Sequence, residues 1–398
     1  MPRPDAAGSR RSQTLPRPAS RRSAIDPFIV MDVLRAANER QAAGDDIIHM
    51  EVGQPATPAP QLAIEAAKAA LEQDRIGYTE ALGLPVLRER IARYYRDRHG
   101  LDIDPERVIV TSGSSAGFIL SFLAILDPGA RMALPSPGYP CYRHILRALG
   151  VEAVTIEVDA RTRWMPTPRQ LEEAVLEKDV AGLLLASPAN PTGTMLLGPA
   201  LGDLAAACER LRLWFVSDEI YHGLDYTQPA QTALAHSPNA IVINSFSKYY
   251  SMTGWRIGWM VVPRDLVRPI ERLAQNLYIS PPTLSQYAAT AAFDAGEELE
   301  AIKSTYARNR DLLLEALPRA GLTEIVPADG AFYLYADVRH LTNDSAALAR
   351  RMLKETGVAI TPGVDFDPGR GAHFVRFCYA GGTREMIEAA RRLHAWLN

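Results

Sequence analysis

The chain has 398 residues, of which 47% are hydrophobic, and a formal net charge of −3. A chain of this length is usually divided between two domains, and its nearly balanced charge argues against binding nucleic acid through bulk electrostatics. No apolar run reaches the roughly 20 residues that a membrane-spanning helix needs, so we expect neither a nucleic-acid partner nor a membrane.

Residues 1–23 differ from the rest of the chain. They hold six arginines, four prolines and a single acid, Asp5, and they show no hydrophobic periodicity. This composition predicts a disordered Arg-rich tail or a start codon assigned too early. A transit peptide, which is also rich in Arg and Ser, is the alternative, although the prolines disfavour an amphipathic helix.

Between residues 60 and 300, helical and strand patterns alternate. Helices are predicted over 62–74, 85–99, 118–126, 167–175 and 201–210. Short apolar strands are predicted over 108–111, 132–134, 153–156, 182–186, 213–217 and 240–244. Their continuous apolar character suits strands buried on both faces. The alternation predicts an α/β fold, with a large, doubly wound, mainly parallel sheet domain over 54–295.

The rhythm changes after about residue 295. Helices are predicted over 297–317, 345–356 and 384–397, with strands over 330–335 and 373–379. We assign these elements to a smaller α+β domain that comprises residues 24–53 and 296–398.

The usage of cysteine, histidine and lysine narrows the chemistry. Three cysteines without a C-x-x-C pair suit the reducing cytoplasm, and eight histidines without ligand spacing predict no metal site. Only five of the 43 basic residues are lysines: Lys68, Lys178, Lys248, Lys303 and Lys354. Because the chain prefers arginine for ordinary charge, a lysine in an apolar neighbourhood indicates amine chemistry, which a guanidinium cannot perform.

Lys248 lies in such a neighbourhood. The apolar strand 240–243 is followed by Ser245, Ser247 and Lys248, and Arg256 lies eight residues further on, between two glycines. A lysine can form a Schiff base with an aldehyde, and hydroxyls together with a bidentate arginine can bind a phosphate. A lysine that merely snorkels from a strand end is the alternative.

Two further strand ends carry polar side chains. Asp218 and Tyr221 follow the strand 213–216, where an ionised carboxylate can pair with a protonated pyridine nitrogen. A helix N-cap is the alternative for this aspartate. Asn190 follows the strand 182–186 in an Asn-Pro-Thr-Gly sequence, which alone indicates only a turn.

Two features point to anions. Ser114 and Ser115 occupy a strand-to-helix turn that would present backbone N–H groups and a positive dipole end. Arg376 lies within the apolar strand 373–378, where a buried guanidinium needs an anion. That anion is either an acid of the chain or the carboxylate of a substrate.

Taken together, these motifs resemble the class I/II aminotransferases, which depend on pyridoxal 5′-phosphate (PLP) and have fold type I. The resemblance runs from about residue 24 to 397, and it is specific because seven or eight motifs stand in the family's order. Besides the residues above, its markers are Gly53-Gln54-Pro55, Tyr78, Tyr139 with Tyr142, and Gly254-Trp255-Arg256.

The resemblance implies PLP as cofactor and a set of residues that hold it. Lys248 would carry PLP as a Schiff base and move a proton, and Asp218 would pair with the ring nitrogen. The other cofactor contacts would come from Asn190 and Tyr221 at the ring oxygen, Tyr139 on the ring face, and Ser114, Ser115, Ser245, Ser247 and Arg256 at the phosphate.

The resemblance also implies the partners. Gly53, Asn190 and Arg376 would bind the substrate α-carboxylate. Tyr78 would reach the phosphate in the neighbouring subunit, which implies a homodimer with shared active sites. The expected reaction moves an amino group from an L-amino acid to a 2-oxo acid.

Two other functions compete with this prediction. A PLP-dependent lyase or synthase, such as a C–S β-lyase, would use the same cofactor residues. A regulator would need a DNA-binding module, for which residues 1–23 are too short. No arginine occurs in 278–287, where a dicarboxylate-specific subgroup carries one, and Phe28 and Ile29 suit apolar substrates.

Overall fold

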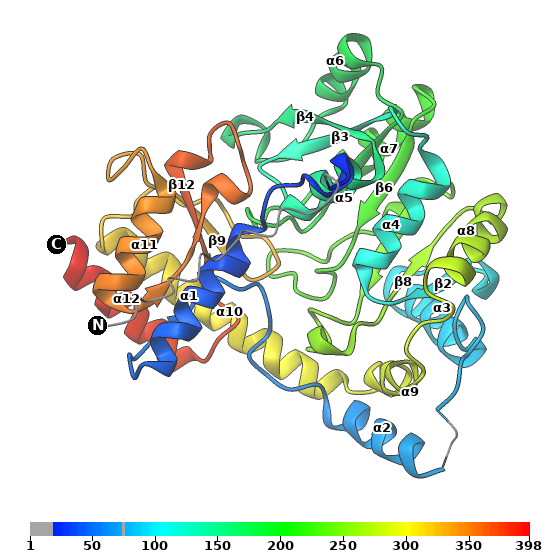
Figure 1. The fold of residues 1–398 in the computed structure, drawn as a ribbon, viewed down its shortest axis with the longest axis horizontal. Helices are drawn as coiled ribbons and strands as arrows, with labels where there is room; N and C mark the ends of the chain where they lie inside the picture. The colour runs from blue at the N-terminus through cyan, green and yellow to red at the C-terminus, as the bar shows by residue number, and fades with distance from the viewer. Residues whose placement is uncertain (1–18, 74–75) are drawn as a thin grey trace, which may run out of the picture.

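A computed structural model describes residues 19–73 and 76–398, and its main feature is a seven-stranded sheet (Figure 1). The strand order is β2-β8-β7-β6-β5-β3-β4, and only β8 runs antiparallel to its neighbours. The strands are β2 (Val108–Thr111), β3 (Arg131–Ser136), β4 (Glu152–Glu157), β5 (Gly182–Ala186), β6 (Trp214–Asp218), β7 (Ile241–Ser245) and β8 (Gly258–Val261).

Helices cover both faces of this sheet, because alternate side chains of its strands enter two separate apolar cores. One face carries α4 (Ser114–Ile125), α5 (Pro140–Leu149) and α8 (Arg264–Leu277). The opposite face carries α2 (Gln61–Gln73), α3 (Pro85–His99), α6 (Pro168–Lys178), α7 (Ala200–Arg210) and α9 (Thr283–Ala292).

A third core forms around a smaller antiparallel sheet of order β11-β12-β9. Its strands are β9 (Tyr333–Asp337), β11 (Thr361–Pro362) and β12 (Phe374–Cys378), and a parallel pair joins β1 (Ile48–His49) to β10 (Val358–Ala359). The helices here are α1 (Ile29–Ala42), α10 (Gly296–Arg319), α11 (Ser345–Thr356) and α12 (Thr383–Leu397). In Figure 1, α10 runs from this smaller unit towards α9. The predicted fold class is therefore confirmed.

Local signals account for the helix boundaries that the sequence predicted well. Pro85 opens α3 at its first turn, and Gly100 closes it in the left-handed conformation at φ 66°. The Thr167 side chain caps α6 in a reciprocal capping box with Gln170. These signals lie within the chain segment itself, so they do not depend on tertiary packing.

Other parts of the sequence-based prediction were incomplete or wrong. Helices α1, α5, α8 and α9 and strand β8 were not predicted, and α4 begins at Ser114, four residues before the predicted start. The strand 153–156 was expected to be buried on both faces, but β4 alternates between buried and exposed residues. The reason is its position at the edge of the sheet, where one face lies open to solvent.

Most of the Arg-rich stretch 1–23 lies outside the described residues, and its last residues, Arg21–Ser23, form one turn of 3-10 helix beside α5. No helix within residues 19–73 and 76–398 is long and apolar enough to cross a membrane.

Candidate active site

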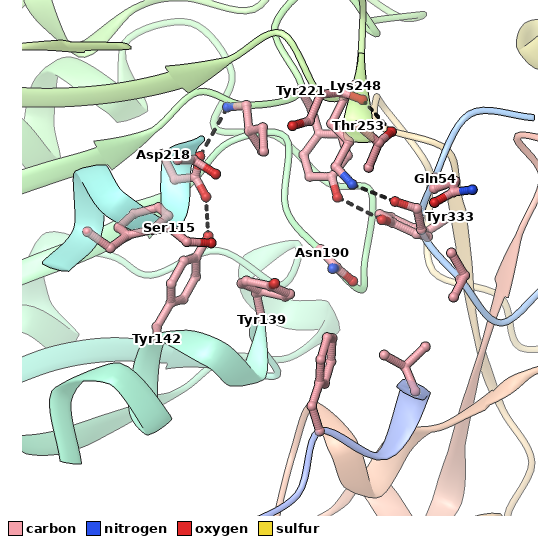
Figure 2. Close-up of a pocket in the computed structure, with 18 of the residues that line it drawn as sticks. Gln54, Ser115, Tyr139, Tyr142, Asn190, Asp218, Tyr221, Lys248, Thr253 and Tyr333 are labelled. Atoms are coloured by element: carbon pink, nitrogen blue, oxygen red, sulfur yellow. Dashed lines mark hydrogen bonds between the residues drawn. The ribbon is translucent and has the colours of Figure 1, made fainter. Parts of the chain in front are cut away.

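A cavity of about 250 Å³ lies between the carboxyl ends of the large sheet's strands and the smaller sheet. Figure 2 shows Asp218, Ser115 and Tyr142 on one side of it, with Tyr333 and Gln54 on the other. Most of the side chains that the sequence singled out line this cavity: Gly53, Ser114, Ser115, Tyr139, Asn190, Asp218, Tyr221, Ser247, Lys248, Arg256 and Arg376.

Lys248 enters the cavity from the turn that follows β7. Its Nζ donates a hydrogen bond of 2.5 Å to the carbonyl oxygen of Gly53. Burial lowers the pKa of this amine from 10.5 to about 8, and the nearby guanidinium groups of Arg376 and Arg256 act in the same direction. A fraction of the amine is therefore uncharged near neutral pH, as a nucleophile or a general base requires.

Asp218 is the last residue of β6, and its carboxylate is buried. One oxygen accepts from the backbone N–H of Ile220 at 3.1 Å, and the other accepts from the hydroxyl of Tyr142 on α5. Burial raises the pKa of Asp218 to about 6, while these hydrogen bonds and Lys248 lower it. At pH 7 the group is mainly a carboxylate. The sequence had noted Tyr142 as a family marker but had given it no role.

The amino end of α4 forms a polar corner of the cavity. Gly113, at φ 77°, precedes the helix, and among the described residues no side chain caps the first N–H groups of α4. The guanidinium of Arg256 lies so close that a Cβ on Gly113 would come within 2.3 Å of Nη2. Ser114, Ser115 and Ser247 face the same cavity. Free N–H groups, hydroxyls and a guanidinium together form a site for an anion.

Two of the predicted residues do not line the cavity. Ser245 is buried behind it, and its hydroxyl donates to the Ile257 carbonyl at 3.0 Å and lies 2.9 Å from the Ser247 hydroxyl, from which it can accept. Ser245 therefore supports Ser247, which lines the cavity, and its own role in binding a phosphate stays a prediction. Tyr78 is 82% exposed and does not line the pocket of its own chain.

Arg376 lies on β12, is only 2% exposed, and forms no ion pair with any described residue. Its guanidinium donates to Asn190 Oδ1 at 2.8 Å, to the carbonyl of Glu51, and to Thr361 Oγ1 at 3.2 Å. All three acceptors are uncharged, and its Nε finds no partner among the described residues. A buried cation without a carboxylate in direct contact favours the binding of an external anion.

Tyr333, on β9, connects several of these groups, although the sequence gave no role to it. Its hydroxyl lies 2.7 Å from that of Tyr221, and its ring centroid lies 4.3 Å from the guanidinium carbon of Arg376. A Cβ on Gly53 would lie 1.9 Å from the Tyr333 hydroxyl, so only glycine fits there. The dashed lines in Figure 2 include the Tyr221–Tyr333 contact.

The remaining wall of the cavity is apolar. It is formed by Phe28, Val30 and Met31 at the start of α1, together with Val52. Phe28 also packs edge-on against Tyr139, with ring centroids 5.8 Å apart. The sequence had singled out Phe28 and Ile29 for their apolar character. Phe28 lines the cavity but Ile29 does not, and the helix that presents Val30 and Met31 had not been predicted.

Comparison with protein families supports this arrangement. Residues 45–393 match the family Aminotransferase class I and II. The chain belongs to this family. As an aminotransferase of this class, it exchanges amino groups between amino acids and 2-oxo acids, and the predicted enzyme type is confirmed.

Individual relatives agree with the family. The valine–pyruvate aminotransferase of Mycobacterium tuberculosis is 48% identical over 380 residues, which cover 94% of this aminotransferase and 97% of the relative. The aspartate/prephenate aminotransferase of Thermus thermophilus is 33% identical over 377 residues, which cover 93% and 96% of the two chains. The lyase alternative gains no support from these two relatives.

Solved structures confirm the fold. An aminotransferase from Mycobacterium tuberculosis matches with a TM-score of 0.93 at 48% identity, over 96% of this chain and 99% of that one. The aspartate aminotransferase of Thermus thermophilus with maleate matches with a TM-score of 0.90 at 32% identity, over 95% and 99% of the two chains.

Proposed function

We propose that this aminotransferase binds PLP in the cavity and transfers amino groups from L-amino acids with apolar side chains. The observation that carries the proposal is the presence of Lys248, Asp218 and the uncapped start of α4 around one cavity. When bound, PLP supplies an aldehyde that bonds to amines and a ring that withdraws electrons from the substrate Cα.

The donors and acceptors around the cavity fit this cofactor. The phosphate is assigned to Ser114, Ser115, Ser247, Arg256 and the free N–H groups of α4, because these groups form the anion site. Asp218 is assigned to the ring nitrogen, since a buried carboxylate that is ionised at pH 7 holds a proton on a neighbouring base. Tyr139 is assigned to the ring face, and Asn190 and Tyr221 to the ring oxygen.

Lys248 has two assigned tasks. Its amine, with a pKa of about 8, would hold the aldehyde group of the cofactor. When free, the same amine would accept the proton from the substrate Cα and would give it back. Both tasks need the uncharged amine, which burial makes accessible.

Arg376 is assigned to the α-carboxylate that every amino donor and every 2-oxo acid acceptor share. Its neutral partners, Asn190, Thr361 and the Glu51 carbonyl, orient the guanidinium without cancelling its charge. A bidentate arginine would then fix the substrate so that its Cα proton faces Lys248.

The side chain of the substrate is assigned to the apolar wall formed by Phe28, Val30, Met31 and Val52. The described cations that line the cavity are Lys248, Arg256 and Arg376, and each already has an assigned role. This chain therefore leaves no cation for a second carboxylate. The valine–pyruvate relative supports the same choice, with an apolar donor and a small 2-oxo acid as acceptor.

A homodimer is part of the proposal. The exposed Tyr78 lies beside the segment 277–283, because Thr283 donates to the Gly77 carbonyl, and Leu277 and Ile279 in that segment are also exposed. We assign a second copy of the chain to this surface, with Tyr78 directed to the phosphate site of its partner. A fully active monomer in sedimentation at assay concentrations would contradict this assignment.

The test is a half-reaction screen. Purified protein loaded with PLP is mixed with each of the twenty amino acids, and the absorption of the cofactor is followed as it changes to that of the amine form. We expect conversion by valine and other apolar amino acids, and much slower conversion by aspartate. Release of ammonia and a 2-oxo acid, with the cofactor not converted to its amine form, would instead support a lyase.

A further inference from the structure

The first turn of α1 is held in place by a residue far away in the sequence. Phe28, Val30 and Met31 of this turn line the cavity, but the N-cap residue, Phe28, has no side chain that could satisfy the free N–H groups of the helix. Those N–H groups must therefore find acceptors elsewhere.

Asp365, in the 3-10 turn Gly363–Asp365, supplies these acceptors. Its Oδ1 accepts from the Ile29 N–H at 3.2 Å, and its Oδ2 accepts from the Val30 N–H at 3.1 Å. The carboxylate is 1% exposed and lies at the positive end of the α1 dipole. Burial raises the pKa of this carboxyl group, whereas the two N–H groups, Arg376 and Arg143 lower it. In the ionised form both bonds are charge-assisted, so together they hold the first turn of α1 more firmly than neutral bonds would.

The loop that carries Asp365 is itself anchored to the rest of the cavity. Arg143 on α5 donates to the Asp365 carbonyl at 2.6 Å. The ring of Phe366 lies 4.7 Å from the guanidinium carbon of Arg376, and its carbonyl accepts from the Gly138 N–H at 3.1 Å. These contacts fix the position of α1 relative to α5 and to Arg376 on β12, the residue assigned to the substrate carboxylate.

We propose that Asp365 is a positioning residue for substrate selection, because it holds the first turn of α1 so that Phe28, Val30 and Met31 form the apolar wall. The inference rests on the proposed function, since the wall matters only if the substrate side chain lies against it. Asp365 does not line the cavity, so it acts through α1 and not by contact with the substrate.

The test compares Asp365→Asn with Asp367→Asn in the PLP-loaded enzyme. Asp367 is a matched control: it is also buried, but its carboxylate accepts from Arg370 and from the Gly369 N–H, and not from the N–H groups of Ile29 and Val30 at the start of α1. The readout is the ratio of kcat/KM for L-valine to that for L-alanine, with pyruvate as acceptor for valine and 2-oxobutyrate as acceptor for alanine.

In Asp365→Asn we expect kcat/KM for valine to fall on the order of tenfold through KM, the effect of one lost hydrogen bond to a charged group. The value for alanine should fall about twofold or less, because its methyl group contacts little of the wall. The absorption of the bound cofactor and kcat at saturation should stay unchanged. The control should keep the wild-type ratio.

A second variant breaks the same contact from the other side. Ile29→Pro removes an N–H that donates to Asp365. Ile29 is the first residue of α1, a position where proline is tolerated. The extended backbone of Phe28, at φ −83° and ψ 99°, is compatible with a following proline. Ile29 does not line the cavity, so a selectivity change would come from the position of α1. This variant decides the question if Asp365→Asn does not fold.

The outcomes separate this inference from the proposed function. If the wild-type enzyme shows no preference for valine over alanine, the proposed apolar selectivity fails, and this inference fails with it. If the wild type prefers valine and both variants keep that preference, only the role of Asp365 is overturned. An equal fall in Asp367→Asn would also overturn it, because the effect would then belong to the loop as a whole.

Discussion

On the sheet side of the cavity, the polar side chains come from strand ends, whereas the opposite side is assembled from segments far apart in the sequence. Asn190, Asp218 and Lys248 lie at or just after the carboxyl ends of β5, β6 and β7. The opposite side takes Phe28 from α1 and Arg376 from β12. Under the proposed function, the groups for the reaction lie on the mainly parallel sheet, while substrate recognition depends on how the smaller unit packs against it.

The largest effect should come from the sheet side, at Lys248. Lys248→Ala should lower kcat by at least roughly 10³-fold, because it removes both the attachment point and the proton carrier. Borohydride treatment followed by mass spectrometry should find no cofactor bound to the variant. Lys303→Ala is the control, since Lys303 is another rare, partly buried lysine. It forms an ion pair of 2.7 Å with Asp225, and neither residue lines the cavity. Turnover near the wild-type value in Lys248→Ala would contradict the assignment.

Asp218 and its neighbour Glu219 should respond very differently. Asp218→Asn should still bind PLP but should lose about 10³-fold in kcat, because an amide cannot hold a proton on the ring nitrogen. Burial raises the pKa of Glu219 to about 8, so this group is mainly protonated at pH 7 and Glu219→Gln preserves its charge state. Glu219→Gln should therefore change kcat little. A loss below tenfold in Asp218→Asn would direct the role to another residue.

On the recognition side, Arg376→Lys should impair all amino donors alike. Lysine keeps the charge but loses the two-pronged geometry. The value of kcat/KM should therefore fall for every donor, by a factor that corresponds to about 2–5 kcal/mol of lost binding free energy. Binding of PLP should be little changed, since its phosphate is assigned to Arg256 and the serines. The measurement compares one apolar and one acidic amino acid. A loss confined to the acidic substrate would assign Arg376 to the side chain instead.

A pH profile can test Lys248 without any mutation. In cofactor-free protein, the rate of PLP attachment should rise with pH and level off above about 8, because the uncharged amine of Lys248 increases up to its pKa. Between pH 7 and pH 9 the expected increase is about tenfold. Stopped-flow absorbance measures this rate. A rate that still rises steadily through pH 10 would show that burial does not lower this pKa.

The smallest effect should come from Tyr333, which connects the two sides. Tyr333→Phe removes the hydroxyl that bonds to Tyr221 and should lower kcat/KM roughly threefold to tenfold, the effect of one ordinary hydrogen bond. Tyr335→Phe is a matched control from the same strand, because the buried hydroxyl of Tyr335 has no partner among the described residues. Equal losses in both variants would mean that Tyr333 contributes only packing.

The sequence by itself determined the fold class and most of the sheet side. Apolar runs marked six of the seven strands, and the polar residues that follow β5, β6 and β7 share one sheet edge because parallel strands end on the same side. The rarity of lysine singled out Lys248 without any structural information. The strand and capping signals are local, since they lie within a few neighbouring residues, whereas the rarity of lysine is a property of the whole sequence.

Only the tertiary structure decided the partners that meet across long sequence separations. Tyr142 reaches Asp218 across 76 residues, Tyr333 reaches Tyr221 across 112, and Asp365 caps Val30 across 335. No periodicity or turn signal encodes such a pair, because each contact depends on how two separate elements pack. For the same reason, the sequence indicated an apolar segment at Phe28 and an apolar strand around Arg376, but it did not show which residues these side chains contact.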